Sequence, residues 1–532
     1  MKKTKVEHSI DIKLFTLLIV GSFLRLFYIG NIPGNTALYS DELFSGYESW
    51  SLLKYGYDYL GYHFPVYLPV WGGGMSCMQA LIQMPFIAFF GLNSFALRLP
   101  AAILGCITIY AFFYICQKIR GIDFAYFAAF ILAVMPWHII QSRWALDCNY
   151  FVGFMAISMA LFLKALDDNK YLPLSFLFFG LTLYTYALPW MVMPVLVIAS
   201  TLYMVIHKKI TINKYFFISI AILAVLALPL LLFLLVNYGF MEEIRTSVFS
   251  IPKLSHFRSN EFTLSPKALI KNFYDTFMLF VSQDDGRVGD VAPAFGLYYK
   301  FSNVFIVIGI GYCLVNAYNK AKEKELNLEA PLLIQFVCAL ILGSVTEIFF
   351  SRINIIHIPM TYFLSVGLWA IIDIVKKHAK EVIIVIYALA CMTFILYYFT
   401  YHDDAVAKAY DDGCKAALEY VDDKIAEGTI AEESQIHLLS GVFFTHVIFY
   451  EKYPTDQYIE DVEYADPQIT GNRIPRKVGK YDLSHCVEGT PLGEPTKNDV
   501  YICSDSDTEA LEYMKEHEMQ MEYFNYIVVG IN

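Results

Sequence analysis

The 532-residue sequence is poor in charge, and it lacks the short motifs of nucleotide-binding and zinc-binding proteins. Only 17% of its residues are charged and 57% are hydrophobic, with a mean hydropathy of +0.48. Soluble domains are about one quarter charged, so this composition excludes an ordinary soluble protein and favours a membrane protein. No P-loop, glycine-rich dinucleotide motif or CxxC pair occurs. The net charge of −11 argues against nucleic acid as a partner.

The charges that are present divide the chain into two parts. From Tyr401 to the end there are 27 Asp and Glu against 10 Lys and Arg, a net charge of −17, whereas the first 400 residues carry +6. We therefore expect a transmembrane domain at 1–400 and an acidic domain at 401–532. Helical and strand patterns alternate in this tail, which predicts a small α/β domain of roughly 120 residues. Its expected helices are 414–426, 441–453 and 506–517, the last opened by a capping box from Ser506 to Glu509, and its expected strands are 435–440, 498–503 and 523–529.

Eleven stretches are candidate membrane spans, for which about 20 apolar residues are needed. The first contains Arg25, and no signal-peptidase-like site follows it, so we expect it to be retained. The apolar stretch at 75–90 is short and contains Pro85, which predicts a juxtamembrane or re-entrant helix. The sequence thus predicts a polytopic α-helical membrane protein, with spans near 12–30, 99–117, 123–140, 150–166, 171–188, 190–207, 215–237, 300–318, 330–350, 354–375 and 382–400.

Every loop that this arrangement places on the inner side of the membrane is basic. Lys and Arg mark cytoplasmic loops, so we expect a multi-pass protein of the cell membrane with a cytoplasmic amino terminus. Counting 75–90 as a span would reverse all the loops that follow it. With eleven spans, and 75–90 not counted as one, three segments face outward: a first loop at 31–98, a second loop at 238–299, and the acidic tail.

Acidic residues on the predicted outer face are candidates for catalysis. Asp41 and Glu42 follow the first span, and Asp147 lies at the next outer turn. A carboxylate at the membrane surface suits a general base, which takes a proton from an attacking hydroxyl. The alternatives are solvated loop acids or, for Asp147, an i,i+4 ion pair with Arg143 that holds a helix end. We take Asp41, Glu42 and Asp147 as the candidate catalytic residues.

The first outer loop is crowded with aromatic, Gly and Pro residues. Long loops of this kind are usually functional, and sugar rings stack on aromatic faces. We expect Tyr62, His63 and Trp71 to contact a substrate, together with Arg143 and Asn149 of the second outer turn. No histidine has a partner at ligand spacing, so the sequence leaves a divalent metal open, and it indicates no organic cofactor.

Three arginines of the outer face are candidates for holding an anion. Arg98 ends the first loop, Arg258 lies in the second loop, and Arg352 lies between two apolar runs. Ionisable residues at membrane depth are functional hypotheses by default, and arginine offers a two-pronged fork to phosphate oxygens. Arg352 is our first candidate for a lipid phosphate; the alternative is an interfacial arginine whose charged end reaches water.

The order of these segments resembles that of the GT-C membrane glycosyltransferases, most closely the bacterial protein O-mannosyltransferase and lipid A aminoarabinose transferase group. The resembling pieces are Asp41-Glu42 with its aromatic loop, then FFGLNSFALRLPAAILG, PWHIIQSRWALDCN and RINIIHIP. The resemblance implies a polyprenyl-phosphate sugar donor, inverting transfer, a catalytic carboxylate at Asp41 beside Glu42, and Asp147 as the second outer acid. Some members of this group hold a metal through Glu and His, which leaves metal dependence open here.

We therefore expect a membrane glycosyltransferase that moves a sugar from a polyprenyl-phosphate donor to an acceptor hydroxyl on the extracytoplasmic face. The sequence does not choose between a protein, a glycolipid and a wall polymer as acceptor. The alternative is a transporter or flippase of a lipid-linked molecule. Transporters often carry charges near the midplane of their spans and show inverted repeats. Here the distinctive charges gather at outer helix ends, and no repeat is visible.

Overall fold

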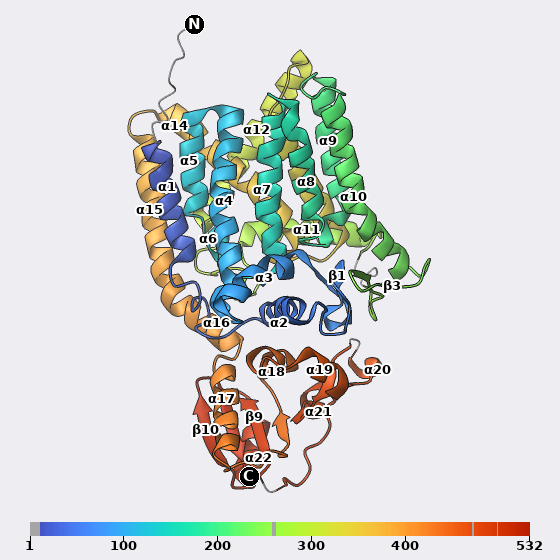
Figure 1. Cartoon of the computed structure of the whole chain (residues 1–532). Coiled ribbons are helices and arrows are strands. Elements are labelled where there is room, and N and C mark those ends of the chain that lie inside the picture. The colour runs from blue at the N-terminus through green and yellow to red at the C-terminus, as the bar shows by residue number, and fades with distance from the viewer. Residues whose placement is uncertain (1–10, 258–261, 471–472, 497) are drawn as a thin grey trace, which may run out of the picture.

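The computed structural model describes residues 11–257, 262–470, 473–496 and 498–532. Figure 1 shows a bundle of long, nearly parallel helices, a layer of short elements across one end of it, and a small domain beyond that layer. The long helices of the bundle are α1 (Ile12–Leu26), α4 (Ser94–Arg120), α5 (Ile122–Ala133), α7 (Asp147–Ala165), α8 (Leu172–Thr182), α9 (Met193–Ile206), α10 (Lys214–Asn237), α12 (Asn303–Glu323), α13 (Ala330–Val345), α14 (His357–Val375) and α15 (Ala379–Tyr397). The short α6 (Pro136–Ser142) follows α5, and α11 (Pro266–Ser282), a helix of the second outer loop, packs against α13.

The bundle confirms a polytopic helical membrane protein. Within the described residues, six helices are long and apolar enough to cross a membrane, and a seventh span results if α5 and α6 are counted as one. These two helices meet at 62° because Pro136 begins α6 and cannot continue the hydrogen-bond ladder of α5. Each of the eleven expected stretches contains a bundle helix, but several, such as α8 and α13, are shorter than a full span. The count of eleven stays a prediction.

The first outer loop forms the layer across the end of the bundle. Helices α2 (Ser40–Tyr55) and α3 (Met78–Phe90) pack against each other there, and α2 lies across the bundle axis (Figure 1). With 13 residues, α3 is too short to cross a membrane alone, in line with the juxtamembrane helix expected at 75–90. Between them runs a small hairpin of β1 (Tyr67–Leu68), η1 (Val70–Gly72) and β2 (Met75–Ser76), and the second outer loop adds the pair β3 (Ile244–Arg245) and β4 (Ser250–Ile251).

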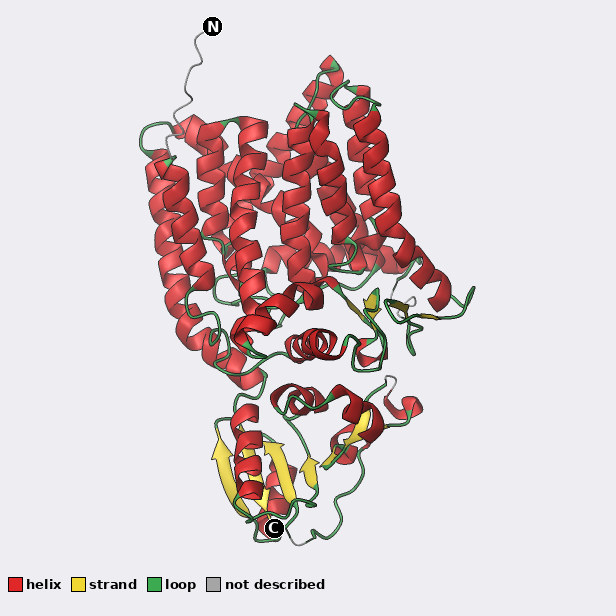
Figure 2. Ribbon diagram, viewed as in Figure 1, coloured by secondary structure: helices red, strands yellow, loops and turns green. Residues whose placement is uncertain are grey.

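The tail is built on one seven-stranded sheet, which holds most of the strands in Figure 2. The strand order is β10-β11-β9-β5-β8-β7-β6, and the central β5 runs parallel to both of its neighbours. The strands are β5 (Ile436–Leu438), β6 (Val462–Tyr464), β7 (Pro475–Val478), β8 (Tyr481–Asp482), β9 (Val500–Ser504), β10 (Gln520–Phe524) and β11 (Ile527–Ile531). The helices are α16 (Asp403–Ala409), α17 (Cys414–Ala426), α18 (Phe444–Tyr450), α19 (Thr455–Asp461), α20 (Pro467–Thr470), α21 (Ser484–Glu488) and α22 (Thr508–Glu516).

Two local expectations for the tail are wrong. The stretch at 523–529 is the turn of a hairpin between β10 and β11, because Asn525 takes a left-handed conformation (φ 48°) that reverses the chain. Helix α22 is capped by Asp507, whose carboxylate accepts a hydrogen bond from the Ala510 backbone N–H at 3.1 Å, and Ser506 lies outside the helix. Asp and Ser cap helices about equally well, so the sequence alone does not distinguish adjacent candidates.

One hydrophobic core joins the tail to the first outer loop. It contains Phe44 and Leu68 from the loop and Leu418 and Val447 from the tail, all buried. The approach is close where α18 crosses α2: a Cβ on Gly46 would come within 2.8 Å of the Phe449 ring. The tail therefore has its own sheet but shares its core with the layer that carries Asp41.

Candidate active site

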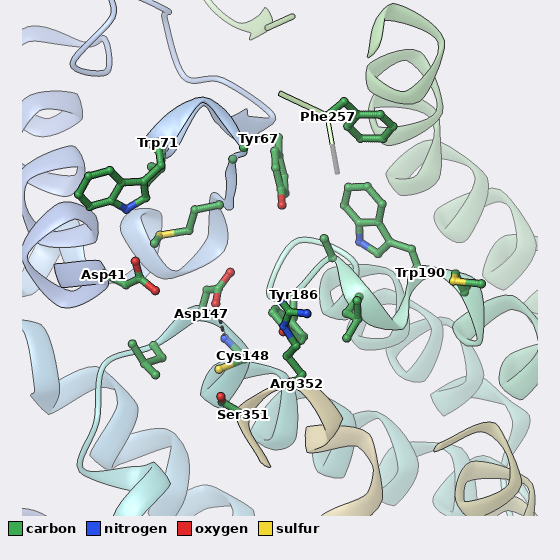
Figure 3. A pocket seen from close by; sticks show the side chains of 18 of the residues that line it. Asp41, Tyr67, Trp71, Asp147, Cys148, Tyr186, Trp190, Phe257, Ser351 and Arg352 are labelled. Carbon is green, nitrogen blue, oxygen red and sulfur yellow. Dashed lines mark hydrogen bonds between the residues drawn. The ribbon is translucent and has the colours of Figure 1, made fainter. Parts of the chain in front are cut away.

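A cavity of about 660 Å³ lies where the outer layer meets the ends of the bundle helices. Its volume is in the range of sites for small molecules, about 300–1,000 Å³. Figure 3 shows side chains entering it from the loop of Trp71, from α2 and from α7. Its charged lining residues are Asp41, Asp147, Arg287 and Arg352, and its aromatic lining residues are Tyr39, Tyr67, Trp71, Tyr186, Trp190, Phe233, Tyr238, Phe257, Phe262 and Phe349.

The two acids come from the first turns of two helices. Asp41 lies in the first turn of α2 and Asp147 begins α7. The positive end of a helix dipole stabilises a carboxylate at this position. Asp147 also accepts hydrogen bonds from the backbone N–H groups of Cys148 (2.7 Å), within α7, and Ser76 (3.4 Å); the second links α7 to the β1–β2 hairpin. The structure thus brings together Asp41 and Asp147, which are 106 residues apart in the sequence.

Two guanidinium groups share the cavity with these acids. Arg352 belongs to η6 (Phe350–Ile356), the turn before α14, and Arg287 belongs to the loop after α11. Both lie against the ring of Phe349, Arg287 at 3.3 Å and Arg352 at 4.7 Å from its centroid. Such contacts on an aromatic face orient a guanidinium, whose N–H edges can still bind an anion. The sequence does not reveal Arg287, because nothing there distinguishes it from a solvated loop arginine.

Aspartates of the second outer loop hold the turn that carries Arg352. Asp290 accepts hydrogen bonds from the hydroxyl (2.9 Å) and the backbone N–H (3.4 Å) of Ser351, and Asp285 accepts one from the backbone N–H of Phe350 (3.0 Å). Burial raises the pKa of Asp290 to about 7, and the neighbouring charge of Asp285 adds to this rise. The loop that supplies Arg287 therefore also fixes Arg352.

Glu42 and Arg98 point away from the cavity and pair with each other. Two hydrogen bonds of 2.9 Å join their charged groups, and both side chains are only 1% exposed. Glu42 also accepts a hydrogen bond from the backbone N–H of Ala145 at 3.1 Å, two residues before Asp147. The pair ties the start of α2 to the turn before α7, and neither side chain lines the cavity, so the direct roles expected for Glu42 in catalysis and for Arg98 in phosphate binding stay predictions.

Among the expected substrate-binding residues, Trp71 lines the cavity and four others have different contacts. The Tyr62 hydroxyl donates to Glu243 at 2.8 Å, and His63 Nδ1 lies 3.0 Å from the Gly56 carbonyl. The other two are Arg143, which donates to the carbonyls of Phe27 (2.8 Å) and Ile32 (2.9 Å) beyond the end of α1, and Asn149, which donates to the Trp144 carbonyl (3.1 Å).

Two further expectations concern the anion and metal sites. Arg258 lies outside the residues that the structure describes. Within those residues, no three His, Cys, Asp or Glu side chains are grouped so that they could hold a metal ion.

Residues 76–233 match the family described as dolichyl-phosphate-mannose-protein mannosyltransferase. No curated protein sequence matches the chain significantly. In fold, the chain is similar to ArnT from Cupriavidus metallidurans in the apo state (TM-score 0.59, 12% identity, 98% of each chain covered) and bound to undecaprenyl phosphate (TM-score 0.54, 13% identity, 98% of each chain). The apo oligosaccharyltransferase of Archaeoglobus fulgidus is also similar (TM-score 0.50, 12% identity, 84% of this chain and 63% of that one).

The likeness to ArnT extends over membrane bundle and tail alike, and the matching sequence segment contains α3, α4 and Asp147. At sequence identities of 12–13%, these matches establish a shared fold but no shared activity. The resemblance inferred from the sequence motifs is thereby confirmed: the chain shares the fold of ArnT, and its residues 76–233 are similar to the dolichyl-phosphate-mannose-protein mannosyltransferase family.

Proposed function

We propose that the protein is a membrane glycosyltransferase that transfers a sugar from a polyprenyl-phosphate donor to an acceptor hydroxyl. The observation that carries the proposal is the single cavity in which Asp41 and Asp147 share space with Arg287 and Arg352. Carboxylates can accept the proton that a hydroxyl loses, and arginines can bind the phosphate that leaves. The mannosyltransferase match and the binding of undecaprenyl phosphate to the similar ArnT support a lipid-linked donor.

In the proposed reaction, Asp41 takes the proton of the acceptor hydroxyl as its oxygen attacks the anomeric carbon of the sugar. The bond between that carbon and the phosphate oxygen breaks, and polyprenyl phosphate leaves with the electron pair. Attack from the side opposite the leaving group inverts the anomeric centre. Arg352 and Arg287 neutralise the phosphate, and the shared cavity holds acceptor and donor in line, so orientation supplies part of the rate.

The position of the charged groups supports an enzyme over a transporter. The cavity carboxylates lie in the first turns of α2 and α7, at the end of the bundle that faces the tail. A transporter of lipid-linked molecules would place its binding charges near the middle of its spans. The aromatic wall beside Asp41 fits a sugar.

The deciding experiment supplies the purified protein with a sugar-loaded polyprenyl phosphate and an acceptor extract of the cell envelope. We expect release of free polyprenyl phosphate together with a glycosylated acceptor, and loss of both with Asp41→Asn. Movement of intact donor across proteoliposomes without release of polyprenyl phosphate would support the transporter instead.

The proposed orientation, with a cytoplasmic amino terminus and an extracytoplasmic tail at the cell membrane, has a separate test. Ser506 is exposed in the tail. With the native cysteines of the outer segments replaced (Cys77, Cys148, Cys414, Cys486 and Cys503), Ser506→Cys should react with a membrane-impermeant reagent in intact cells. Labelling only after lysis would place the tail, and with it the cavity, on the inner side.

A further inference from the structure

Two rings of the cavity wall are backed by rings from the C-terminal part of the chain. Trp71 meets Phe444 of α18 edge-on, with centroids 5.1 Å apart and planes at 80°. Tyr39 lies 5.1 Å from Tyr410, which follows α16. Trp71 and Tyr39 line the cavity, and Phe444 and Tyr410 lie behind them. This part of the wall therefore has an inner layer from the first outer loop and an outer layer from beyond residue 400.

Trp71 is held in a backbone conformation that a bulky residue rarely adopts. Its φ of 54° and ψ of 13° are left-handed, and such a conformation persists only where its surroundings impose it. Backbone hydrogen bonds close the turn on both sides of Trp71, from Gly72 to Pro69 and from Gly74 to Val70. Its ring packs against two phenyl rings: Phe44 of α2 lies 5.6 Å from Trp71 and 5.7 Å from Phe444, so the three rings form one cluster. Phe444 is 1% exposed, so it fills a site from which water is excluded.

The tail also holds the chain immediately before Asp41. The carboxylate of Asp412 accepts hydrogen bonds from the Asn35 side chain (2.9 Å) and the Thr36 backbone N–H (3.2 Å). The hydroxyl of Tyr450 donates to the Thr36 carbonyl at 3.1 Å. Both the chain that leads into α2 and the hairpin that carries Trp71 thus contact the tail, and Phe444 is the tail residue that packs directly on the Trp71 ring.

The geometry points to Phe444 as a positioning residue that holds the Trp71 ring at the angle at which it stacks on the sugar of the lipid-linked donor. The tail is then a structural part of the donor site, and not a separate binding module. The part played by the sugar rests on the proposed function. The dependence of the Trp71 ring orientation on Phe444 rests on the contacts alone. The orientation of the ring and its contact with the sugar can be tested separately.

The first test needs no turnover. The protein has six tryptophans, so the full-length chain labelled with 5-fluorotryptophan should give six fluorine NMR signals, of which Trp71→Phe identifies one. We expect Phe444→Leu to shift or split the Trp71 signal and to leave the other signals in place. The matched control is Tyr523→Ala, an aromatic residue of the same domain that is 56% exposed. An unchanged Trp71 signal in Phe444→Leu would overturn the inference; if that variant does not fold, Phe444→Met, which preserves more of the volume, takes its place.

The second test is a kinetic cycle with the sugar-loaded carrier. Phe444→Leu should raise the KM for the donor about threefold to tenfold with a smaller change in kcat, the size expected for one aromatic contact. In a Trp71→Ala background the same substitution should change the KM no further, because its effect passes through the missing ring. Equal effects in both backgrounds would overturn the inference. If the wild type shows no transfer at all, the proposed function fails while the NMR result still decides the role of Phe444.

Discussion

Helix α2 carries acids on two faces, and the faces differ in what surrounds them. On the cavity face, Asp41 shares an open space with arginines that an anionic ligand can reach. On the core face, Glu42 is closed off with Arg98, and Glu48 is fully buried beside Asp58. The side chains are chemically alike, so it is access and partnership that separate a candidate base from a structural acid. Substitutions on the cavity face should therefore lower the rate of transfer, whereas substitutions on the core face should lower the stability of the fold.

The largest effect should come from the cavity face. Asp41→Asn keeps the size and hydrogen bonding of the side chain but removes its basicity, so turnover should fall by about 10²–10⁴ while the thermal unfolding temperature stays within a few degrees. The measurement is release of polyprenyl phosphate at matched folded protein, with Asp275→Asn on the exposed side of α11 as control. Wild-type turnover in Asp41→Asn beside an inactive Asp147→Asn would assign the base to Asp147.

On the core face, Glu42→Gln should act on stability. It leaves the Arg98 charge buried without its partner, which typically costs about 3–5 kcal/mol, and the unfolding temperature should fall accordingly. Adding Arg98→Met removes the stranded charge and should recover part of the loss. For comparison, breaking the exposed Lys271–Asp275 pair should cost only about 0–1 kcal/mol. A Glu42→Gln protein with normal stability and no turnover would return Glu42 to the reaction.

The same contrast applies to the arginines, since only those that line the cavity should affect the KM for the donor. Arg352→Ala removes charge-assisted hydrogen bonds to phosphate, so the KM for the donor should rise by about 10- to 100-fold, and lysine should restore it only in part because it lacks the fork. Arg287→Ala should act in the same direction. Arg245, which is 54% exposed and paired with Glu243, is the matched control. Unchanged donor dependence in Arg352→Ala would leave the phosphate to Arg287.

The smallest effect concerns pH. Burial raises the pKa of Asp58 to about 7 and raises the pKa of Glu48 well above its usual range, with Asp58 adding to it, whereas the charge of Arg245 opposes the rise at Asp58. The folded protein thus keeps protons that the unfolded chain releases above about pH 4, so the unfolding free energy should fall as the pH rises from about 4 to about 7. Glu48→Gln removes one of the two titrating groups. The fall in unfolding temperature between about pH 4 and about pH 7 should therefore be a few degrees smaller in this variant than in the wild type. Identical pH slopes would show that the pair does not titrate in this window.

The parts of the fold that follow from local pattern could be predicted. Apolar runs place a helix in each of the eleven expected stretches, and α17 begins and ends where its pattern predicts. The hairpin at 520–531 could not be predicted. The apolar stretch 523–529 looks like one strand in the sequence, but the left-handed Asn525 reverses the chain within it. The number of complete spans also stays open, since breaks such as that between α5 and α6 depend on tertiary packing as much as on Pro136.

Candidate site residues could be predicted where a charged residue lies next to an apolar run. They could not be predicted where the role of a residue depends on contacts between distant parts of the chain. Asp41, Asp147 and Arg352 each flank an apolar run, and the structure places all three in one cavity. Glu42 and Arg98 looked the same in the sequence, but their pairing across 56 residues is visible only once α2 and α4 are packed. Arg287 looked like an ordinary loop arginine in the sequence, and its place in the cavity beside the ring of Phe349, 62 residues later in the chain, is visible only in the structure.

The core shared by the first outer loop and the tail has a consequence for biosynthesis. Phe44 and Leu68 leave the ribosome long before their packing partners, such as Val447 and Ile502. Until these arrive, the loop that carries Asp41 exposes its apolar side, and the wall around Trp71 lacks its outer layer. Domains generally fold from the amino terminus during synthesis, but the wall of this cavity is complete only after the tail has been synthesised. A chain cut short near residue 400 is therefore expected to reach the membrane as a bundle without a finished site, a state that quality-control proteases can recognise.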